Sequence, residues 1–190
     1  GYDGRKPLVD PMCGSGTFTL EAAMLAKQMA SGQRRRFAFM DWPAFREPQW
    51  AFLKKEAGSK MQMLAQPRIF ASDIDGKACR QLSTTISANG FSDAVTVRDK
   101  DFFDCRGDQY GDRTGLVIIN PPYGIRIGSR KQIGQLFQRI CRHLKAAFNG
   151  WDLALIAPDR KLLRNLPFAV RQVPLRHGGL RLTLLMGTVR

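Results

Sequence analysis

Short apolar runs alternate with segments of helical periodicity along this chain. The apolar runs predict strands over residues 8–9, 68–75, 94–101, 114–120 and 151–158. Apolar positions with helical spacing predict helices over residues 18–30, 76–90 and 131–148. Strands that alternate with helices form βαβ units, so the pattern predicts an α/β protein with a mainly parallel sheet.

Two more apolar runs lie near the end of the chain. They cover residues 169–175 and 180–189, and they flank the sequence RHGG, which is typical of a chain reversal. A hairpin here adds an antiparallel strand at one edge of the sheet. The complete pattern predicts a mainly parallel seven-stranded sheet with an antiparallel C-terminal strand.

Residues 31–67 interrupt the alternation and resemble an insertion. The stretch opens with a basic run, Arg34 to Arg36, which we interpret as solvated surface. Apolar residues then recur at helical spacing: Trp50, Leu53, Ala57, Met61 and Leu64. This spacing predicts a helix whose apolar side faces the core. No linker or repeat divides the chain, so we expect one domain over residues 1–190.

Composition adds limits on the class of protein. Of the 190 residues, 44% are hydrophobic and 24% are charged, as in an ordinary globular protein. No apolar run approaches the roughly 20 residues of a membrane span, and no signal peptide is visible, so we expect a cytoplasmic protein without a membrane partner. The four cysteines are widely spaced and only two histidines are present, which predicts reduced thiols and no metal site.

The net charge is the one unusual total. Thirty Lys and Arg stand against sixteen Asp and Glu, which gives +14. A surplus of this size favours a polyanionic partner, most plausibly nucleic acid, through neutralisation of phosphates. The alternative is a basic surface without a partner, and charge alone does not separate DNA from RNA.

Unusual residues follow four of the predicted strands. They are Asp10–Thr17, Ser72–Asp75, Asp101–Phe102 and Asn120–Tyr123. Ligands of open α/β sheets bind at the carboxyl ends of the strands. We therefore expect these four stretches to form one site.

The first stretch, DPMCGSGT, predicts a tight turn in which the backbone approaches a ligand at Gly14 and Gly16. The helix that follows presents free N–H groups to an anion. The turn is not a P-loop, because no G-K-[ST] follows, and Thr19 occupies the third glycine position of a dinucleotide fingerprint. Taken alone, such a turn also suits a plain connection between a strand and a helix.

Two acids extend this interpretation. Asp73 is well placed to accept hydrogen bonds from ribose hydroxyls, Ile74 beside it can pack on a purine, and Asp101 can accept from an exocyclic amine. For each acid taken alone, a helix N-cap or a solvated turn residue is the favoured interpretation. Together, a turn that binds a carboxylate, a ribose acid and a base-reading acid describe a nucleoside with an amino-acid tail. That ligand is S-adenosylmethionine (SAM).

The motifs DPMCGSGT, SDID and NPPY, in this order, resemble class I methyltransferases that modify amino groups of nucleobases. More narrowly, the chain is similar to the bacterial 23S rRNA guanine-N2 methyltransferases, through FMDWPAF after the first helix and VPLRHGGLRLTL near the end. The resemblance covers nearly the whole chain. It implies a Rossmann-like sandwich that transfers a methyl group from SAM to the N2 amino group of a guanine in ribosomal RNA.

The resemblance also implies roles for the cofactor-site residues. Asp10 and the backbone of the turn would hold the methionine part of SAM. The turn residues concerned are Met12, Cys13, Gly14, Ser15, Gly16 and Thr17. Asp73 would hold the ribose and Ile74 the adenine. Asp101 would bond the adenine amino group, and the Phe102 backbone would meet the edge of the ring.

The acceptor would lie against Asn120, Pro121, Pro122 and Tyr123. An exocyclic amine is a poor nucleophile because its lone pair is delocalised into the ring. The Asn120 side-chain oxygen and the Pro121 carbonyl can accept its two N–H bonds, which turns the lone pair toward the methyl group. The two prolines hold these acceptors stiffly, and Tyr123 can stack on an extruded base.

Basic residues follow this motif at Arg126, Arg130 and Lys131. They are candidate contacts to substrate phosphates, and solvated surface is the alternative. In the enzymes that the chain resembles, the catalytic domain usually follows an RNA-binding THUMP domain. The chain begins too close to its first strand to include one, so we expect a monomeric catalytic domain from a longer protein.

Three alternatives remain open from the sequence. An adenine-N6 methyltransferase of DNA or RNA shares the NPPY residues. A release-factor glutamine methyltransferase shares them too, but the basic surplus and the hairpin sequence argue against it. The third alternative, from a different class, is an RNA-binding module without catalytic activity.

Overall fold

The computed structural model describes residues 2–33, 35–122, 130–157, 163, 166–177 and 179–190. Within these residues, seven strands form one sheet in the order β3-β2-β1-β4-β5-β7-β6. The parallel strands are β1 (Leu8–Asp10), β2 (Ile69–Asp73), β3 (Val95–Asp99), β4 (Leu116–Ile119) and β5 (Asp152–Ala157). The hairpin of β6 (Val170–His177) and β7 (Leu180–Thr188) joins β5 in antiparallel fashion. The predicted seven-stranded mixed sheet is confirmed.

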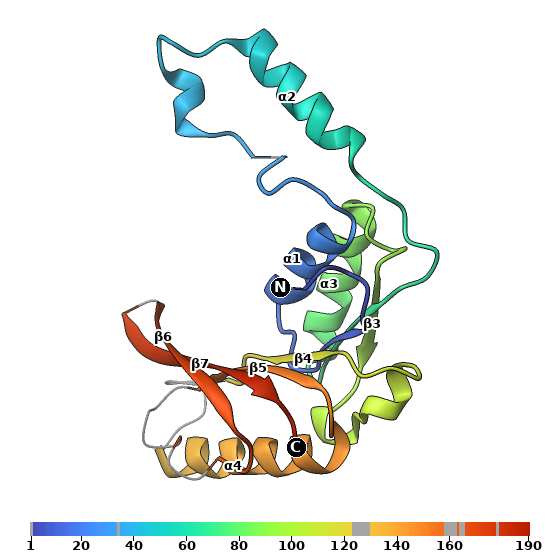
Figure 1. Cartoon of the computed structure of the whole chain (residues 1–190), viewed down its shortest axis with the longest axis vertical. Coiled ribbons are helices and arrows are strands. Elements are labelled where there is room, and N and C mark those ends of the chain that lie inside the picture. The colour runs from blue at the N-terminus through green and yellow to red at the C-terminus, as the bar shows by residue number, and fades with distance from the viewer. Residues whose placement is uncertain (1, 34, 123–129, 158–162, 164–165, 178) are drawn as a thin grey trace.

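Helices cover both faces of this sheet, as Figure 1 shows. α1 (Thr17–Ala26) and α3 (Gly76–Ala88) lie on one face, over a core that includes Ala23, Leu82 and Ile69. α4 (Arg130–Ala147) covers the other face, where its apolar side meets the buried residues of β4, β5 and β7. The result is a three-layer sandwich. No helix in the described ranges is long and apolar enough to cross a membrane.

The third strand ends two residues earlier than predicted. β3 stops at Asp99 because residues 102–104 form a short 3-10 helix, η2 (Phe102–Asp104), instead of continuing the ladder. Asp101 caps this turn, since its Oδ1 accepts from the backbone N–H of Phe103 at 2.9 Å. A second 3-10 helix, η3 (Gly107–Tyr110), follows before β4.

The prediction that the apolar residues of the insertion face the core is confirmed for Leu64, which packs against the core after the helix, but is wrong for the helix itself. α2 (Glu47–Ser59) buries none of its residues, and the Phe52 and Leu53 side chains are 67% and 53% exposed. Figure 1 shows α2 in an arm that projects away from the sheet. Aromatic rings of the arm, some of them beside η1 (Ala38–Asp41), pack on one another instead: Phe37, Phe39, Phe45 and Trp50. The helical spacing therefore builds a local cluster outside the main core.

A buried ion pair fixes the base of this arm. Lys27 Nζ lies 2.5 Å from Asp93 Oδ2, and the two side chains are only 4% and 15% exposed. The same carboxylate oxygen accepts from the backbone N–H of Leu64 at 2.9 Å. The backbone N–H of Gln62 donates to the Lys27 carbonyl at 3.0 Å. The returning end of the arm is thus held to the end of α1.

Candidate cofactor and acceptor site

The strand order brings all four predicted stretches to one edge of the sheet. β1 lies between β2 and β4, and β3 lies beside β2, with all four strands parallel. Their carboxyl ends therefore point the same way. The glycine turn follows β1, Ile74 follows β2, Asp101 follows β3, and Asn120 follows β4.

The glycine turn has the backbone conformation that its sequence requires. Gly14 and Gly16 have φ values of 50° and 82°, a region that favours glycine. A Cβ on Gly16 would lie 2.2 Å from Leu82 Cδ1, so the turn also packs tightly on α3. Gly16 caps α1 without a side-chain hydrogen bond, which leaves N–H groups of the first turn of α1 available to an anion.

Asp73 holds the turn against β2. Its Oδ2 accepts from the backbone N–H of Gly14 at 2.8 Å, and its Oδ1 accepts from the N–H of Asp75 at 3.0 Å. The backbone N–H of Cys13 also donates to the Ser72 carbonyl at 3.0 Å. Each carboxylate oxygen of Asp73 keeps a second lone pair for ribose hydroxyls. Asp75 instead caps α3 by accepting from Lys77 and Ala78.

Asp10 is the most deeply buried acid of the site, at 1% exposure. Its Oδ2 accepts from the Thr19 hydroxyl at 2.7 Å, whereas its Oδ1 is buried and bonds to no described residue. Burial disfavours the charged form and raises the pKa of this carboxyl to about 7. An ammonium group, such as that of the methionine part of SAM, would complement the ionised carboxylate.

The residues expected around adenine divide into exposed and buried ones. Ile74 is 73% exposed at the end of β2, which suits an apolar contact with a bound ring. Asp101 is exposed, and its second oxygen bonds to no described residue. Phe102 is 1% exposed, and its ring packs against His143 and Phe148 in the core. Only the backbone of Phe102 is therefore available to a ligand.

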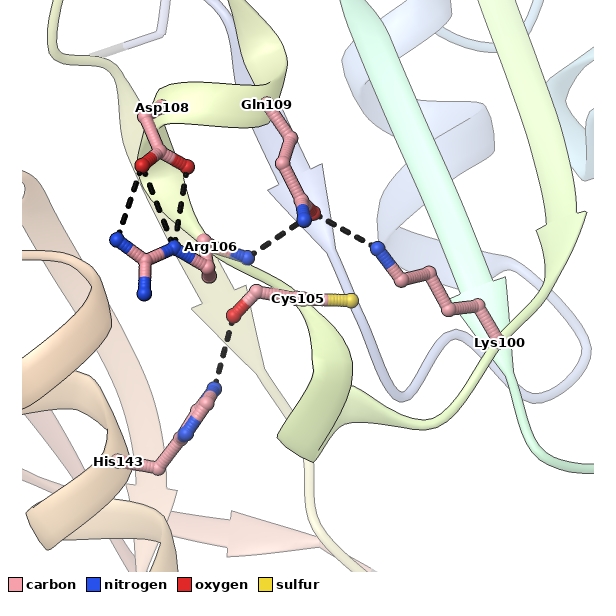
Figure 2. A network of polar contacts seen from close by, with 6 residues as sticks. All are labelled: Lys100, Cys105, Arg106, Asp108, Gln109 and His143. Atoms are coloured by element: carbon pink, nitrogen blue, oxygen red, sulfur yellow. Dashed lines mark hydrogen bonds and ion pairs between the residues drawn. The ribbon is translucent and has the colours of Figure 1, made fainter.

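A polar network braces the segment behind Asp101 (Figure 2). Gln109 Oε1 accepts from Lys100 Nζ at 2.7 Å and from the Arg106 backbone N–H at 3.2 Å. The His143 Nε2 on α4 lies 2.8 Å from the Cys105 carbonyl oxygen. These contacts tie the loop after β3 to α4, so the segment that follows Asp101 is held in place.

Asn120 leaves β4 at the centre of this edge. Its side-chain Oδ1 is buried and accepts from no described residue. Pro121 is buried and Pro122 is exposed. Tyr123 and Arg126 lie outside the described residues. Arg130 and Lys131 begin α4, and their side chains lie outside the description too.

Two functional contacts were missed from the sequence. The hydroxyl of the buried Thr19 donates to Asp10. The sequence feature that indicates this contact is a hydroxyl residue in the expected helix, nine positions after the acid. Leu82 of α3 packs against the turn at Gly16. Neither residue's neighbours in the sequence indicate that the two lie in contact. Met12 and Ser15 lie between β1 and α1, and Thr17 begins α1.

The orphaned acid oxygen, the open glycine turn and the exposed Ile74 fit SAM. In the part of the chain that the structure describes, no group of three or more His, Cys, Asp or Glu residues is arranged to hold a metal ion. This sheet order with a glycine turn after β1 defines the class I methyltransferases. The chain belongs to the RMKL-like methyltransferase domain family (UPF0020), whose model matches residues 1–185. Its cofactor is SAM.

Solved structures share the fold. The structure of SMU.472 complexed with SAH is 27% identical, has a TM-score of 0.87, and is matched over 100% of this chain and 50% of its own. A possible methylase from Clostridium difficile 630 is 26% identical with a TM-score of 0.85, over 98% and 48%. A predicted N6-adenine-specific DNA methylase from Listeria monocytogenes is 24% identical with a TM-score of 0.75, over 94% and 46%. The chain thus spans about half the length of these proteins.

Proposed function

We propose that this methyltransferase modifies the exocyclic N2 amino group of a guanine in ribosomal RNA. The observation that carries the proposal is Asn120 Oδ1, a buried acceptor without a described partner at the end of β4. Buried polar atoms normally have a partner. An amino N–H of a bound base would supply one.

The chemistry of this position follows from its two neighbouring acceptors. SAM supplies a methyl group on a positively charged sulfur, a good electrophile. Asn120 Oδ1 and the Pro121 carbonyl accept the two N–H groups of the target amine and turn its lone pair toward that methyl group. The nitrogen–carbon bond forms as the carbon–sulfur bond breaks, and the amine then loses a proton to water. Rate comes mainly from alignment of the reacting atoms.

The net charge of the chain indicates the class of substrate. The net charge of +14 favours a nucleic-acid substrate, and the sequence resemblance favours ribosomal RNA over DNA. Asp10 and the glycine turn hold the methionine part in this proposal, Asp73 the ribose, Ile74 and Asp101 the adenine. Tyr123, Arg126, Arg130 and Lys131 are assigned to the acceptor and its phosphates by sequence alone.

The test is analysis of the methylated nucleoside. Ribosomal RNA that lacks its natural methyl groups is incubated with the chain and labelled SAM, then digested and separated by mass spectrometry. N2-methylguanosine is the expected product. Detection of N6-methyladenosine instead would show that the acceptor is adenine. SAM binding without any methylated nucleoside would favour the non-catalytic RNA-binding module.

A further inference from the structure

The basic surplus is concentrated in the acceptor half of the chain. Residues 120–190 contain thirteen of the thirty Lys and Arg residues but only two of the sixteen acids, Asp152 and Asp159, for a net charge of +11. Residues 1–119 contain seventeen bases and fourteen acids, for a net charge of +3. Asp152 begins β5, at the edge of the sheet opposite Asn120. Its Oδ2 lies 3.6 Å from Lys6 Nζ.

Two arginines of the β6–β7 hairpin face each other. Arg176 and Arg181 are directly opposite in the antiparallel register, and both are exposed. Like charges directly opposite one another destabilise a strand pair. No described residue forms a hydrogen bond or ion pair with either guanidinium. The neighbouring pair of the same hairpin, Leu175 and Leu182, is apolar. Stability of the hairpin therefore does not account for two opposed arginines.

Register places this arginine pair at the edge that holds the site. Ala157 ends β5 and pairs with Thr183, so Arg181 lies two residues beyond the carboxyl end of β5. Asn120 follows Ile119, which pairs with Leu155 one strand away. Two strand spacings across and three residues along give about 14 Å between the Cα atoms of Asn120 and Arg181. That separation suits a phosphate about two nucleotides from the target base.

The arginines also lie on the face that α4 covers. Residues 181, 183 and 185 share one face because side chains alternate along a strand. Leu185 belongs to the core cluster that includes Ile140 and Leu144 of α4. The start of α4 and the tip of the hairpin lie on the same side of the molecule (Figure 1). In the strand order, the arginine pair is also nearer to β4, which Asn120 follows, than to β1, which the glycine turn follows.

We propose that Arg176 and Arg181 together bind one backbone phosphate of the nucleic-acid substrate. The inference rests on the proposed function and adds a substrate-binding site to it. A single phosphate between two guanidinium groups relieves their repulsion, and arginine matches phosphate geometry through paired N–H donors. The same contact fixes the register of the substrate without reading its sequence.

The test compares Arg176→Gln/Arg181→Gln with the charge-matched control Arg171→Gln/Arg190→Gln. Arg171 lies on the same strand but on its opposite face, and Arg190 follows β7 at the other edge of the sheet. The probe is a fluorescently labelled single-stranded RNA of mixed sequence, titrated at several salt concentrations. SAM affinity, melting temperature and methyl transfer to undermethylated ribosomal RNA are measured in parallel.

The hairpin variant should bind the probe about tenfold more weakly than the control, with a log Kd–log[salt] slope reduced by roughly 0.7. Its KM for RNA should rise while SAM affinity stays unchanged. Its melting temperature at low salt should equal or exceed that of the wild type, because the repulsion is gone. A lower melting temperature with unchanged RNA binding would show that the two arginines stabilise the fold and do not bind RNA, which would overturn the inference.

Two further outcomes separate this inference from the proposed function. Methyl transfer by the wild type together with equal RNA binding by both double variants would overturn the phosphate site and leave the proposed function standing. A wild type that binds SAM but transfers no methyl group to RNA or DNA would overturn both.

Discussion

The backbone N–H of Gly14 donates to Oδ2 of Asp73 at 2.8 Å, which joins two residues 59 positions apart. Asp73 therefore shapes the glycine turn, and in the proposed function the turn holds the methionine part of SAM while the remaining lone pairs of Asp73 face the ribose. One carboxylate thus links both halves of the cofactor site. Loss of this carboxylate should damage the whole cofactor site, because the turn and the ribose contact depend on the same group.

Asp73→Ala should weaken SAM binding by ~2 kcal/mol or more, a loss of roughly 30-fold, because hydrogen bonds to a charged group are removed. Asp73→Asn keeps one acceptor oxygen and should lose less. Isothermal calorimetry with SAM measures both values. Equal affinity of the alanine variant and the wild type would show that Asp73 has no part in the cofactor site.

Gly16→Ala should prevent the turn from closing. The new Cβ would lie 2.2 Å from Leu82 Cδ1, at a φ of 82° that disfavours any side chain. We expect a loss of stability of about 1–3 kcal/mol and a large loss of SAM affinity. Gly90→Ala is the matched control, since Gly90 has a φ of 69° but open space around its Cβ and lies outside the site.

Both variants should have a lower free energy of unfolding in urea, because each places an alanine at a positive φ. Only Gly16→Ala should lose SAM binding. If the two variants bound SAM equally well, close packing of the turn on α3 would be unimportant for the cofactor.

Asp10 should make both stability and cofactor binding depend on pH. Burial raises its pKa from 3.8 to about 7, so the unfolded chain ionises first as the pH rises. The free energy of unfolding should therefore fall between pH 4 and pH 7, by about 4 kcal/mol at most, and then level off. SAM affinity should rise over the same range, because the ionised carboxylate attracts the ammonium of the ligand.

Asp10→Asn keeps the size of the side chain and an acceptor for the Thr19 hydroxyl but cannot ionise. Its SAM affinity should be lower at pH 8 and nearly constant from pH 5 to pH 8. Calorimetric titrations across this range measure the effect. A wild-type affinity that did not change with pH would contradict the role given to Asp10.

The Lys27–Asp93 pair should hold the base of the arm. Although burial opposes ionisation of Asp93, hydrogen bonds from Lys27 and the Leu64 N–H keep the pKa of this carboxyl below its ordinary value. Lys27→Met would leave the carboxylate without its cation and should cost about 3 kcal/mol in stability. The double variant Lys27→Met/Asp93→Asn should lose less than the two single variants added together. Urea denaturation gives all four values.

The sequence predicted the sheet well because its signals are local. Alternation of apolar runs and helical segments is written into neighbouring residues, and each strand of the site ends in a recognisable residue such as Asp10 or Asn120. Parallel pairing then brings those ends together. The antiparallel hairpin of β6 and β7 was expected from the turn sequence between two apolar runs, whereas the order of the strands in the sheet was not predicted.

The contacts that were missed depend on tertiary packing. Apolar spacing in the insertion predicted a helix, but no local feature shows whether a helix meets the sheet or projects from it. The exposed Phe52 and Leu53 are the result. Similarly, Leu82 beneath Gly16 and Thr19 against Asp10 become neighbours only after the helices pack. The expected roles of Tyr123 and Arg126 fall outside the described residues and stay predictions.

Single-turnover methyl transfer by Asn120→Ala, measured beside its SAM affinity, separates catalysis from cofactor binding. We expect the rate to fall by the equivalent of about 2–4 kcal/mol, because one positioned acceptor for the amine is lost. SAM affinity should stay near that of the wild type. The control Asn149→Ala, an exposed position between α4 and β5, should change neither. A transfer rate for Asn120→Ala close to that of the wild type would contradict methylation of an amine held at this residue.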